Sequence, residues 1–401
     1  MKSDRIYLDN SATTALRGDV ADAMRETLEA NYNPNSLHDE GRRARAVLDA
    51  ARERIASLLG ASRSEIIFTS NGTEANNLAL LGAVRAGPPG SRVVTVATEH
   101  ASVLSAIEHL AEKGVETTVL PVDSDGRLDP ASFSEALGPR TILASVGYAN
   151  NEIGAVQPVA ELARIAHRHG VVFHTDAVQA PGWLPLDVRE LGVDLLSLSA
   201  HKFHGPKGVG ALFIRRGTPI APITYGGGQE FGLRPGTQNV AGIVGMARAL
   251  ELAQLERADQ SKRVAALRDR LEAGIRAAIS DVRVNGAEPR LASILNVSFD
   301  GADSAALLIA LDLAGIAASA GSACTSGSLE PSHVLAALGV ESRWQRGGIR
   351  FSLGRATSPA EIERVLEVMP GLLADVRRPT ERLAGGMGRL KTNGARLERK
   401  A

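Results

Sequence analysis

Between about residues 40 and 250, short apolar runs alternate with segments of helical periodicity, and this alternation restricts the fold more than any other feature. The runs are rich in β-branched residues, which is typical of buried strands. Between them lie amphipathic helices such as Arg42–Leu59 and the one around Val159–Ala166, which end at Gly60 and Gly170. Strands alternating with helices predict a largely parallel sheet covered on both faces. The expected strands are Ile66–Thr69, Arg92–Ala97, Thr117–Val122, Ile142–Val146, Val171–His174, Leu195–Ser199 and Gly210–Ile214.

A smaller α/β unit is expected toward the C-terminus. A long charged helix over 247–280 precedes a few short elements, namely strand-like Ile294–Phe299, a helix near Ala305–Leu313, strand-like Ile349–Leu353 and a helix from Pro359 to about Leu373. We expect four parts: an N-terminal segment that packs with the small domain (1–15), a large domain (16–258), a small domain (259–384) and a flexible basic tail (385–401).

The charge balance, the apolar runs and the N-terminal segment argue against several classes of protein. Lysine plus arginine and aspartate plus glutamate both number 45, so the balanced charge gives no support for direct binding of nucleic acid or an anionic membrane. No apolar run approaches the length of a membrane span. The N-terminal segment lacks the apolar core of a signal peptide, so we expect a cytoplasmic protein.

The chain contains one cysteine, Cys324, which excludes an intramolecular disulfide. A lone cysteine is often a small buried apolar residue. Here it lies within Ser319–Ser328, a stretch of small, polar and glycine residues that is typical of an exposed, mobile loop. The surroundings therefore favour a reactive thiol over a packing residue.

Lys202 directly follows an apolar strand, at the end where open α/β sheets bind ligands. A lysine in such a position can be desolvated and lose its proton, as Schiff-base chemistry requires. The alternative is an ordinary surface lysine at a strand end. Lys207 is a competing candidate, but its Pro-Lys-Gly turn favours exposure to solvent.

Two further strand ends carry candidate ligands for a cofactor. Asp176 ends a buried strand, where a carboxylate needs a partner such as a protonated pyridine nitrogen or, alternatively, the amides of the next turn. Asn71-Gly72-Thr73 lies between a strand and a helix, where free amides and a hydroxyl can bind phosphate. The same residues also fit a simple helix cap. The nine histidines show no metal-binding spacing, so no metal is expected.

Nearly the whole chain resembles the NifS/IscS-type cysteine desulfurases of aminotransferase class V. The matching segments are Tyr7–Thr14, Asn33-Pro34, Thr98-Glu99-His100, Asn150–Gly154, Asp176–Gln179, Ser199–Lys202, Arg234–Thr237, Gly321–Ser332 and Ile349–Gly354. The segment around Cys324 is similar to the long-loop subgroup, and the NifS branch is the best match. The resemblance implies the fold-type I architecture of enzymes that use pyridoxal 5'-phosphate (PLP), with a mostly parallel seven-stranded sheet and a smaller C-terminal α/β domain.

The resemblance also implies roles for individual residues. Lys202 would bind PLP covalently, His100 would stack on its ring, Asp176 would hold the ring nitrogen and Gln179 the phenolic oxygen. The implied phosphate ligands are Gly72, Thr73, Ser199 and His201, with Thr237 contributed by the second subunit of a homodimer. The implied substrate-binding residues are Asn33, Asn151 and Arg350, and Asn151 would also bind the cofactor. L-Cysteine would be the substrate, and Cys324 would take its sulfur as a persulfide for delivery to an acceptor protein.

Attack on the substrate sulfur requires a thiolate, whereas an ordinary thiol, with a pKa of about 8.5, is mostly protonated at neutral pH. We therefore hypothesise that His100 or the chemistry of the substrate thiol assists deprotonation of Cys324. The flexible segment would let Cys324 approach the cofactor and then reach an acceptor.

Three positions depart from the family pattern: Arg346 replaces a frequent histidine, Asn31-Tyr32 precedes Asn33 in place of a glycine, and the basic tail lacks a scaffold-docking pattern. Two other functions fit the residues. One is a different PLP enzyme, such as a selenocysteine lyase or a class V aminotransferase; the other is a sulfur-carrier or assembly subunit without turnover. The acceptor is open among iron–sulfur assembly, tRNA thiolation, cofactor synthesis and DNA sulfur modification.

Overall fold

A seven-stranded sheet forms the centre of the large N-terminal unit. The computed structural model describes residues 5–29, 32–320 and 332–377. The strand order is β2-β8-β7-β6-β5-β3-β4, and all neighbours are parallel except β8, which is antiparallel to β2 and β7. The bounds are β2 (Ile66–Thr69), β3 (Arg92–Val96), β4 (Glu116–Leu120), β5 (Thr141–Ser145), β6 (Val172–Asp176), β7 (Leu195–Ser199) and β8 (Gly210–Ile214). The prediction of a largely parallel sheet is confirmed.

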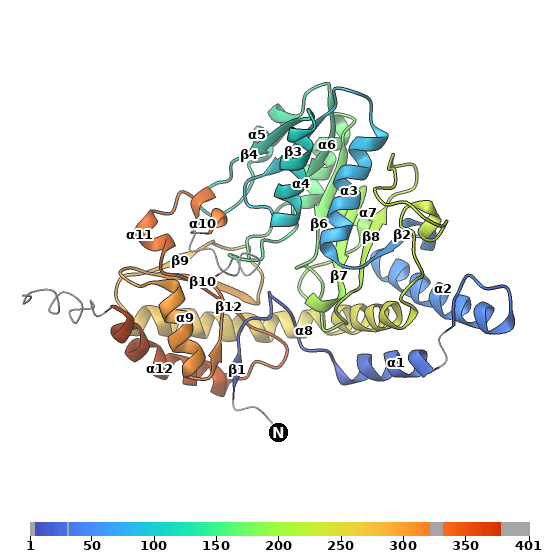
Figure 1. Cartoon of the computed structure of the whole chain (residues 1–401). Coiled ribbons are helices and arrows are strands. Elements are labelled where there is room, and N and C mark those ends of the chain that lie inside the picture. Colours follow the sequence, from blue (N-terminus) through green and yellow to red (C-terminus); the bar gives the residue numbers. More distant parts are fainter. Residues whose placement is uncertain (1–4, 30–31, 321–331, 378–401) are drawn as a thin grey trace, which may run out of the picture.

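Helices cover both faces of this sheet (Figure 1). They are α1 (Gly18–Glu29), α2 (Asp39–Leu59), α3 (Gly72–Ala86), α4 (Ala101–Glu112), α5 (Pro130–Ala136), α6 (Val159–Arg168), α7 (Val188–Leu191) and α8 (Val240–Ala278), with the 3₁₀ turns η1 (Arg63–Glu65), η2 (Ala200–Lys202) and η3 (Glu230–Gly232). The expected helix over 42–59 starts three residues earlier, where His38 caps the amide of Gly41. It ends as predicted at Gly60, whose φ of 69° suits glycine.

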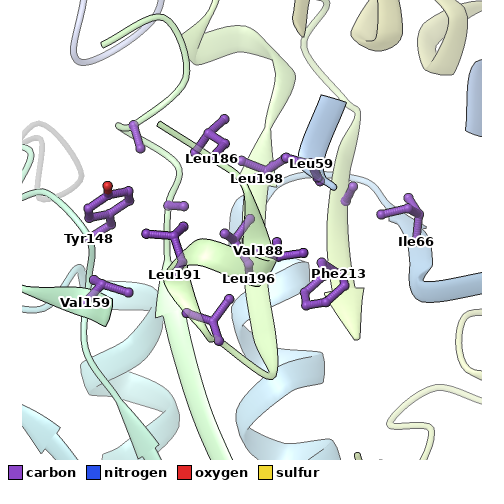
Figure 2. Close-up of a cluster of buried hydrophobic side chains, with 14 of the residues drawn as sticks. Leu59, Ile66, Tyr148, Val159, Leu186, Val188, Leu191, Leu196, Leu198 and Phe213 are labelled. Carbon is purple, nitrogen blue, oxygen red and sulfur yellow. The ribbon is translucent and has the colours of Figure 1, made fainter. Parts of the chain in front are cut away.

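The alternation of side chains along the strands divides the interior into two apolar layers. Leu196 and Leu198 on β7 pack with residues of α2, α6 and α7, including Val188 and Leu191 (Figure 2). Leu195, which points to the opposite face, packs with α3 and α4. Because both faces of the central strands are buried, apolar residues dominate these strands, which is why they were recognisable in the sequence.

The C-terminal unit contains a three-stranded antiparallel sheet in the order β12-β10-β9. Its elements are β9 (Val282–Asn285), β10 (Ile294–Phe299), α9 (Ser304–Leu313), β11 (Ile316–Ala317), α10 (His333–Ala337), α11 (Ser342–Gln345), β12 (Gly348–Ser352) and α12 (Pro359–Arg377). The short strand β1 (Ile6–Tyr7) pairs in parallel with β11. No helix in the described part of the chain is long and apolar enough to cross a membrane.

Helix α8 runs from the large sheet to the small one along the base of the molecule (Figure 1). Its residues up to Leu252 belong to the apolar cluster of the large sheet, whereas those from Val264 onward belong to the cluster of the small sheet. The division expected after residue 258 falls between these two sets. The domain bounds stay a prediction, and the tail at 385–401 lies outside the described residues.

A buried ion pair connects α2 to the edge of the large sheet. The Arg52 guanidinium donates to both carboxylate oxygens of Glu230, at 2.8 and 2.7 Å, and both side chains are almost inaccessible to solvent. Glu230 also accepts from the amide of Phe68 at 2.8 Å, while Arg52 donates to the carbonyl of Ile66 and stacks over the Phe68 ring. Removal of either partner would leave a buried charge without compensation.

We therefore predict that Arg52→Met lowers the free energy of unfolding by about 3–5 kcal/mol, the usual cost of breaking a buried ion pair from one side. Chemical denaturation followed by circular dichroism measures the difference. The control is Arg43→Met, which removes an exposed ion pair with Asp39 from the same helix and should change stability by less than about 1 kcal/mol. Equal effects of the two substitutions would contradict the assignment.

Candidate active site

A pocket of about 530 Å³ opens where several parallel strands of the large sheet end. This volume lies within the range of small-molecule sites, and strand ends are where α/β sheets bind ligands. The segments after β2, β3, β5, β6 and β7 all contribute lining residues. The pocket brings together most of the predicted site residues: Gly72, Thr73, His100, Asn151, Asp176, Gln179, Ser199, His201, Lys202 and Arg350.

Lys202 lies in η2, the 3₁₀ turn that directly follows β7. Its Nζ donates to the carbonyl oxygens of Ser11 and Ala12, at 2.5 and 2.9 Å. Gln179 Nε2 donates to the same Ser11 carbonyl at 3.1 Å. The N-terminal segment therefore forms one wall beside the lysine amine. Lys207, the competing lysine, is exposed and does not line the pocket.

Asp176 is the last residue of β6, and its two carboxylate oxygens have different partners. Oδ1 accepts from the amide of Val178 at 2.9 Å, and Oδ2 accepts from Asn76 Nδ2 at 2.7 Å. The turn-capping role considered from the sequence is thus present. The same carboxylate also lines the pocket, so it can hold a positively charged ring nitrogen as well.

His100 is the N-cap residue of α4, and its ring Nδ1 accepts from the Ser102 amide at 3.1 Å. The Ser102 hydroxyl lies 2.8 Å from the same ring nitrogen. Because two groups of the helix terminus hold one edge of the imidazole, the ring has a fixed orientation at the pocket wall. Such a fixed ring suits stacking on a flat ligand.

The wall at the end of β7 and the start of α3 can bind an anion. Asn71 caps α3 by accepting from the Glu74 amide, so the N-cap reading of this segment is also correct. The Ser199 hydroxyl is buried and has no hydrogen-bond partner within the described ranges. Burial, aided by nearby Lys202, lowers the pKa of His201 to about 4, so this ring is neutral at physiological pH. A free hydroxyl and helix amides are typical phosphate ligands.

A side chain at position 72 would require Val178 to move. A Cβ atom there would lie 2.7 Å from Val178 Cγ2, which real contacts do not allow. The close approach of the α3 start to the segment after β6 therefore requires the absence of a side chain, which leaves the first helical amides accessible from the pocket.

Arg350 on β12 reaches the pocket from the small sheet and is 1% exposed. Its Nη1 donates to the Asn151 carbonyl at 3.0 Å, and its Nη2 donates to Asp9 Oδ1 at 2.7 Å. These contacts orient the guanidinium, whose planar fork of N–H donors matches the geometry of a carboxylate.

Several predicted residues lie elsewhere. Asn33 and Thr237 are exposed and do not line the pocket of their own chain, although a hydrogen bond of 3.1 Å from Asn35 to Gln238 brings their segments together. Cys324 lies outside the described residues. The unusual Arg346 is exposed and away from the pocket. In the residues that are described, no group of three or more histidine, cysteine, aspartate or glutamate side chains could hold a metal ion.

Several polar residues that line the pocket had no predicted role: Asn76, Glu99, Ser102, Glu152 and His333. Glu152 accepts from the Ser332 hydroxyl at 2.5 Å, and His333 Nε2 lies 2.9 Å from the Glu99 carbonyl oxygen. For Glu99 and Glu152, the signal in the sequence was their position next to the predicted site residues His100 and Asn151. The contacts themselves join distant segments, which a sequence motif does not reveal.

Glu99 is buried next to His100, and its carboxyl pairs with no cation among the residues that the structure describes. Burial raises its pKa to about 8, the amide of Gly147 opposes this by donating to the carboxyl at 2.6 Å, and the charge of Asp176 raises it further. In the unfolded chain a glutamate ionises near pH ~4.3. The folded state therefore favours the neutral acid.

We predict that Glu99 destabilises the fold progressively as the pH rises from about 5 to about 8, because ionisation is favoured in the unfolded chain and opposed in the folded one. Glu99→Gln cannot ionise, so this loss should be absent in the variant. The melting temperature of the variant minus that of the wild type should therefore increase as the pH rises through this range. Thermal unfolding at several pH values tests this, with Glu108→Gln, an exposed residue of α4, as control. A difference that does not change with pH would contradict it.

The comparison with known proteins agrees with the geometry of the pocket. The aminotransferase class-V family matches residues 6–365. A cysteine desulfurase IscS from Dictyoglomus turgidum is 47% identical over 375 residues, which cover 93% of this chain and 95% of that protein. A cysteine desulfurase from Cereibacter sphaeroides is 48% identical over 379 residues, or 93% and 97% of the two chains.

Solved structures give the same result. A NifS-like protein superposes with a TM-score of 0.87 at 38% identity, covering 92% of this chain and 100% of that one. A structure described as SspA in complex with cysteine superposes with a TM-score of 0.77 at 34% identity, covering 87% and 98%. The chain therefore belongs to the aminotransferase class-V family and, within it, to the NifS/IscS-type cysteine desulfurases.

Proposed function

We propose that this protein is a cysteine desulfurase that converts L-cysteine to L-alanine and transfers the sulfur to Cys324 as a persulfide. The observation that carries the proposal is the convergence of Lys202, Asp176 and Arg350 in one pocket. These residues supply an amine, a carboxylate for a ring cation and a carboxylate-binding guanidinium. Relatives that share nearly half of the residues over 93% of the chain are named cysteine desulfurases.

The pocket fits PLP as the cofactor. Ser199 has a buried hydroxyl without a partner in the described part of the chain, which suits a phosphate oxygen, and Gly72 with Thr73 opens the start of α3 beside it. Asp176 would hold the ring nitrogen, Gln179 the phenolic oxygen, and Lys202 would bind the cofactor covalently. Bound PLP supplies an electron sink for the pair left at the substrate Cα after proton removal.

The residues of the chain perform the remaining steps. Arg350, with Asn151 beside it, would bind the substrate carboxylate and place Cα near the Lys202 amine, which would take the Cα proton and later return one to the product. The Cys324 thiolate would attack the substrate sulfur. The carbon–sulfur bond of L-cysteine breaks, a sulfur–sulfur bond forms on Cys324, and the substrate carbon gains a proton to become L-alanine.

The described residues near Cys324 support its role. Ser319 pairs with Arg350 through two backbone hydrogen bonds, of 3.2 and 2.6 Å. On the far side, His333 lines the pocket itself. The described residues on the two sides of the Cys324 segment thus lie at the pocket, Ser319 through its pairing with Arg350 and His333 in the wall itself.

The proposal includes a homodimer with shared active sites. Its support is that Asn33 and Thr237 are exposed and lie apart from the pocket of their own chain, on segments joined through Asn35 and Gln238. In the dimer, Thr237 would reach the phosphate of the partner's cofactor. Exposed Tyr32 and Phe231 provide apolar surface in the same segments. A sulfur-acceptor protein and a cytoplasmic location remain parts of the proposal.

We predict that Cys324→Ser abolishes sulfide and persulfide formation from L-cysteine, because no other cysteine can accept the sulfur. The measurement is the release of sulfide with a reducing thiol, together with the alanine formed. In the wild type the two products should be equimolar. The cofactor absorbance should be retained in the variant, since Lys202 is unchanged.

The matched control is Ser328→Ala, in the same segment, which should keep full turnover. Wild-type activity that persists in Cys324→Ser would contradict the proposal and favour a class V enzyme that needs no thiol. A wild-type protein that binds PLP without producing alanine would favour an assembly subunit without turnover.

A further inference from the structure

A chain of side-chain hydrogen bonds connects Asp176 to His100. Asn76 on α3, which is 1% exposed, donates from Nδ2 to Asp176 Oδ2 at 2.7 Å and to the Ser102 hydroxyl at 2.9 Å. The Ser102 hydroxyl is 2.8 Å from His100 Nδ1. Asn76 and Ser102 therefore lie between the candidate ligand of the ring nitrogen and the candidate ring-stacking residue, and the proposed reaction has assigned them no role.

The direction of every bond in this chain follows from the carboxylate. An ionised carboxylate only accepts, so Asn76 must turn its NH2 group toward Asp176. The second hydrogen of that NH2 group then points to the Ser102 oxygen. Because this oxygen accepts from Asn76, its own hydrogen is available for His100 Nδ1. The order of donors and acceptors is thus fixed from Asp176 outward.

The α4 terminus favours the same state of His100 through a second donor, and the tautomer depends on both donors together. The backbone amide of Ser102 can only donate, and it points to Nδ1 at 3.1 Å. A hydrogen on Nδ1 would oppose this amide, so the neutral ring carries its hydrogen on Nε2. The positive end of the α4 dipole also disfavours a second proton on a ring at the N-cap. Similar placement keeps histidine neutral and donating in other enzymes.

We propose that Asn76 and Ser102 are positioning residues that hold His100 as its Nε2–H tautomer and tie its orientation to Asp176. The meaning of this inference for catalysis rests on the proposed function. His100 then donates a hydrogen bond or proton from Nε2. Its one unprotonated nitrogen, Nδ1, already accepts from the Ser102 amide and hydroxyl and is not available to take a proton from Cys324. The hypothesis that His100 activates the thiol is therefore replaced by a donor role.

The direct test is nitrogen NMR of the holoenzyme with ¹⁵N-labelled histidine, the His100 signal being assigned by its loss in His100→Gln. We expect an unprotonated Nδ1 and a protonated Nε2 in the wild type. In Ser102→Ala the hydroxyl donor is lost, and the signal should shift toward a mixture of tautomers. A protonated Nδ1 in the wild type, or a signal unchanged in Ser102→Ala, overturns the proposal.

The second test compares kinetics. Ser102→Ala and Asn76→Ala should each lower kcat for L-cysteine with little change in KM. The expected loss is roughly 10- to 100-fold, as when the hydrogen-bond partners of metal-binding histidines are removed. Because the two residues act through one series of hydrogen bonds, the double variant should lower kcat by about as much as the more damaging single substitution. Ser102→Thr, which keeps the hydroxyl, should restore kcat and the NMR signature.

Two controls separate this role from a general loss of structure. Ser105→Ala removes an exposed hydroxyl from the same helix, and Asn77→Ala removes an amide that bonds only within α3, to the Thr73 carbonyl. Neither should change kcat or the His100 signal. If the two losses of kcat add in the double variant, Asn76 and Ser102 do not act through one series of hydrogen bonds, and the proposal is contradicted. Since the NMR test needs no turnover, absence of desulfuration in the wild type would refute the proposed function and leave the tautomer assignment standing.

Discussion

The site depends on one electrostatic constraint, the need to compensate the carboxylate of Asp176 at the end of a strand enclosed on both faces. A charge in this position is costly unless donors surround it. The Val178 amide and Asn76 supply two donors, and the pocket leaves the carboxylate accessible to a cationic ligand. Neighbouring strands reinforce the arrangement, because His174 lies between the Ser145 and Ser197 hydroxyls at 2.8 and 3.0 Å, which connects β5, β6 and β7.

Two residues of the pocket carry buried polar atoms that a ligand could pair. Within the described residues, the Ser199 hydroxyl and Asn76 Oδ1 are such atoms, and both residues line the pocket. Unpaired polar groups of this kind cost stability in the absence of a ligand. In the ranges that the structure describes, buried polar atoms without a partner also occur away from the pocket, for example Arg52 Nε beside the Arg52–Glu230 ion pair. The position of Ser199 and Asn76 in the pocket wall, and not the unpaired state alone, therefore links these two residues to ligand binding.

Local periodicity predicted the sheet well because apolar residues dominate the central strands, whose two faces are both buried. β2, β7 and β8 have the expected bounds, and the ends of the other four strands shift by at most two residues. The short strand β9 was missed because its Arg283 and Asn285 interrupt the apolar pattern. Helix α8 starts earlier than expected, at Val240, since its apolar first turns resemble a buried segment more than an amphipathic helix.

The candidate site was predictable where a chemical group follows a strand directly, as with Lys202 and Asp176. The resemblance added Arg350 and His100. Asn76 and Ser102 could not be found in this way, because their contacts join α3 to β6 and α4 and have no local sequence signal. Asn33 and Thr237 lie outside the pocket of their own chain, which a linear motif cannot reveal.

The central claim is that one pocket holds PLP on Lys202 and passes the substrate sulfur to Cys324. The most direct measurement is peptide mapping by mass spectrometry, before and after a single turnover with L-cysteine, with borohydride used to fix the cofactor to its lysine. The account predicts the reduced cofactor on the peptide that contains Lys202 and, after turnover, one additional sulfur on the peptide that contains Cys324. Cofactor on another lysine, or an unmodified Cys324 after alanine has formed, would contradict it.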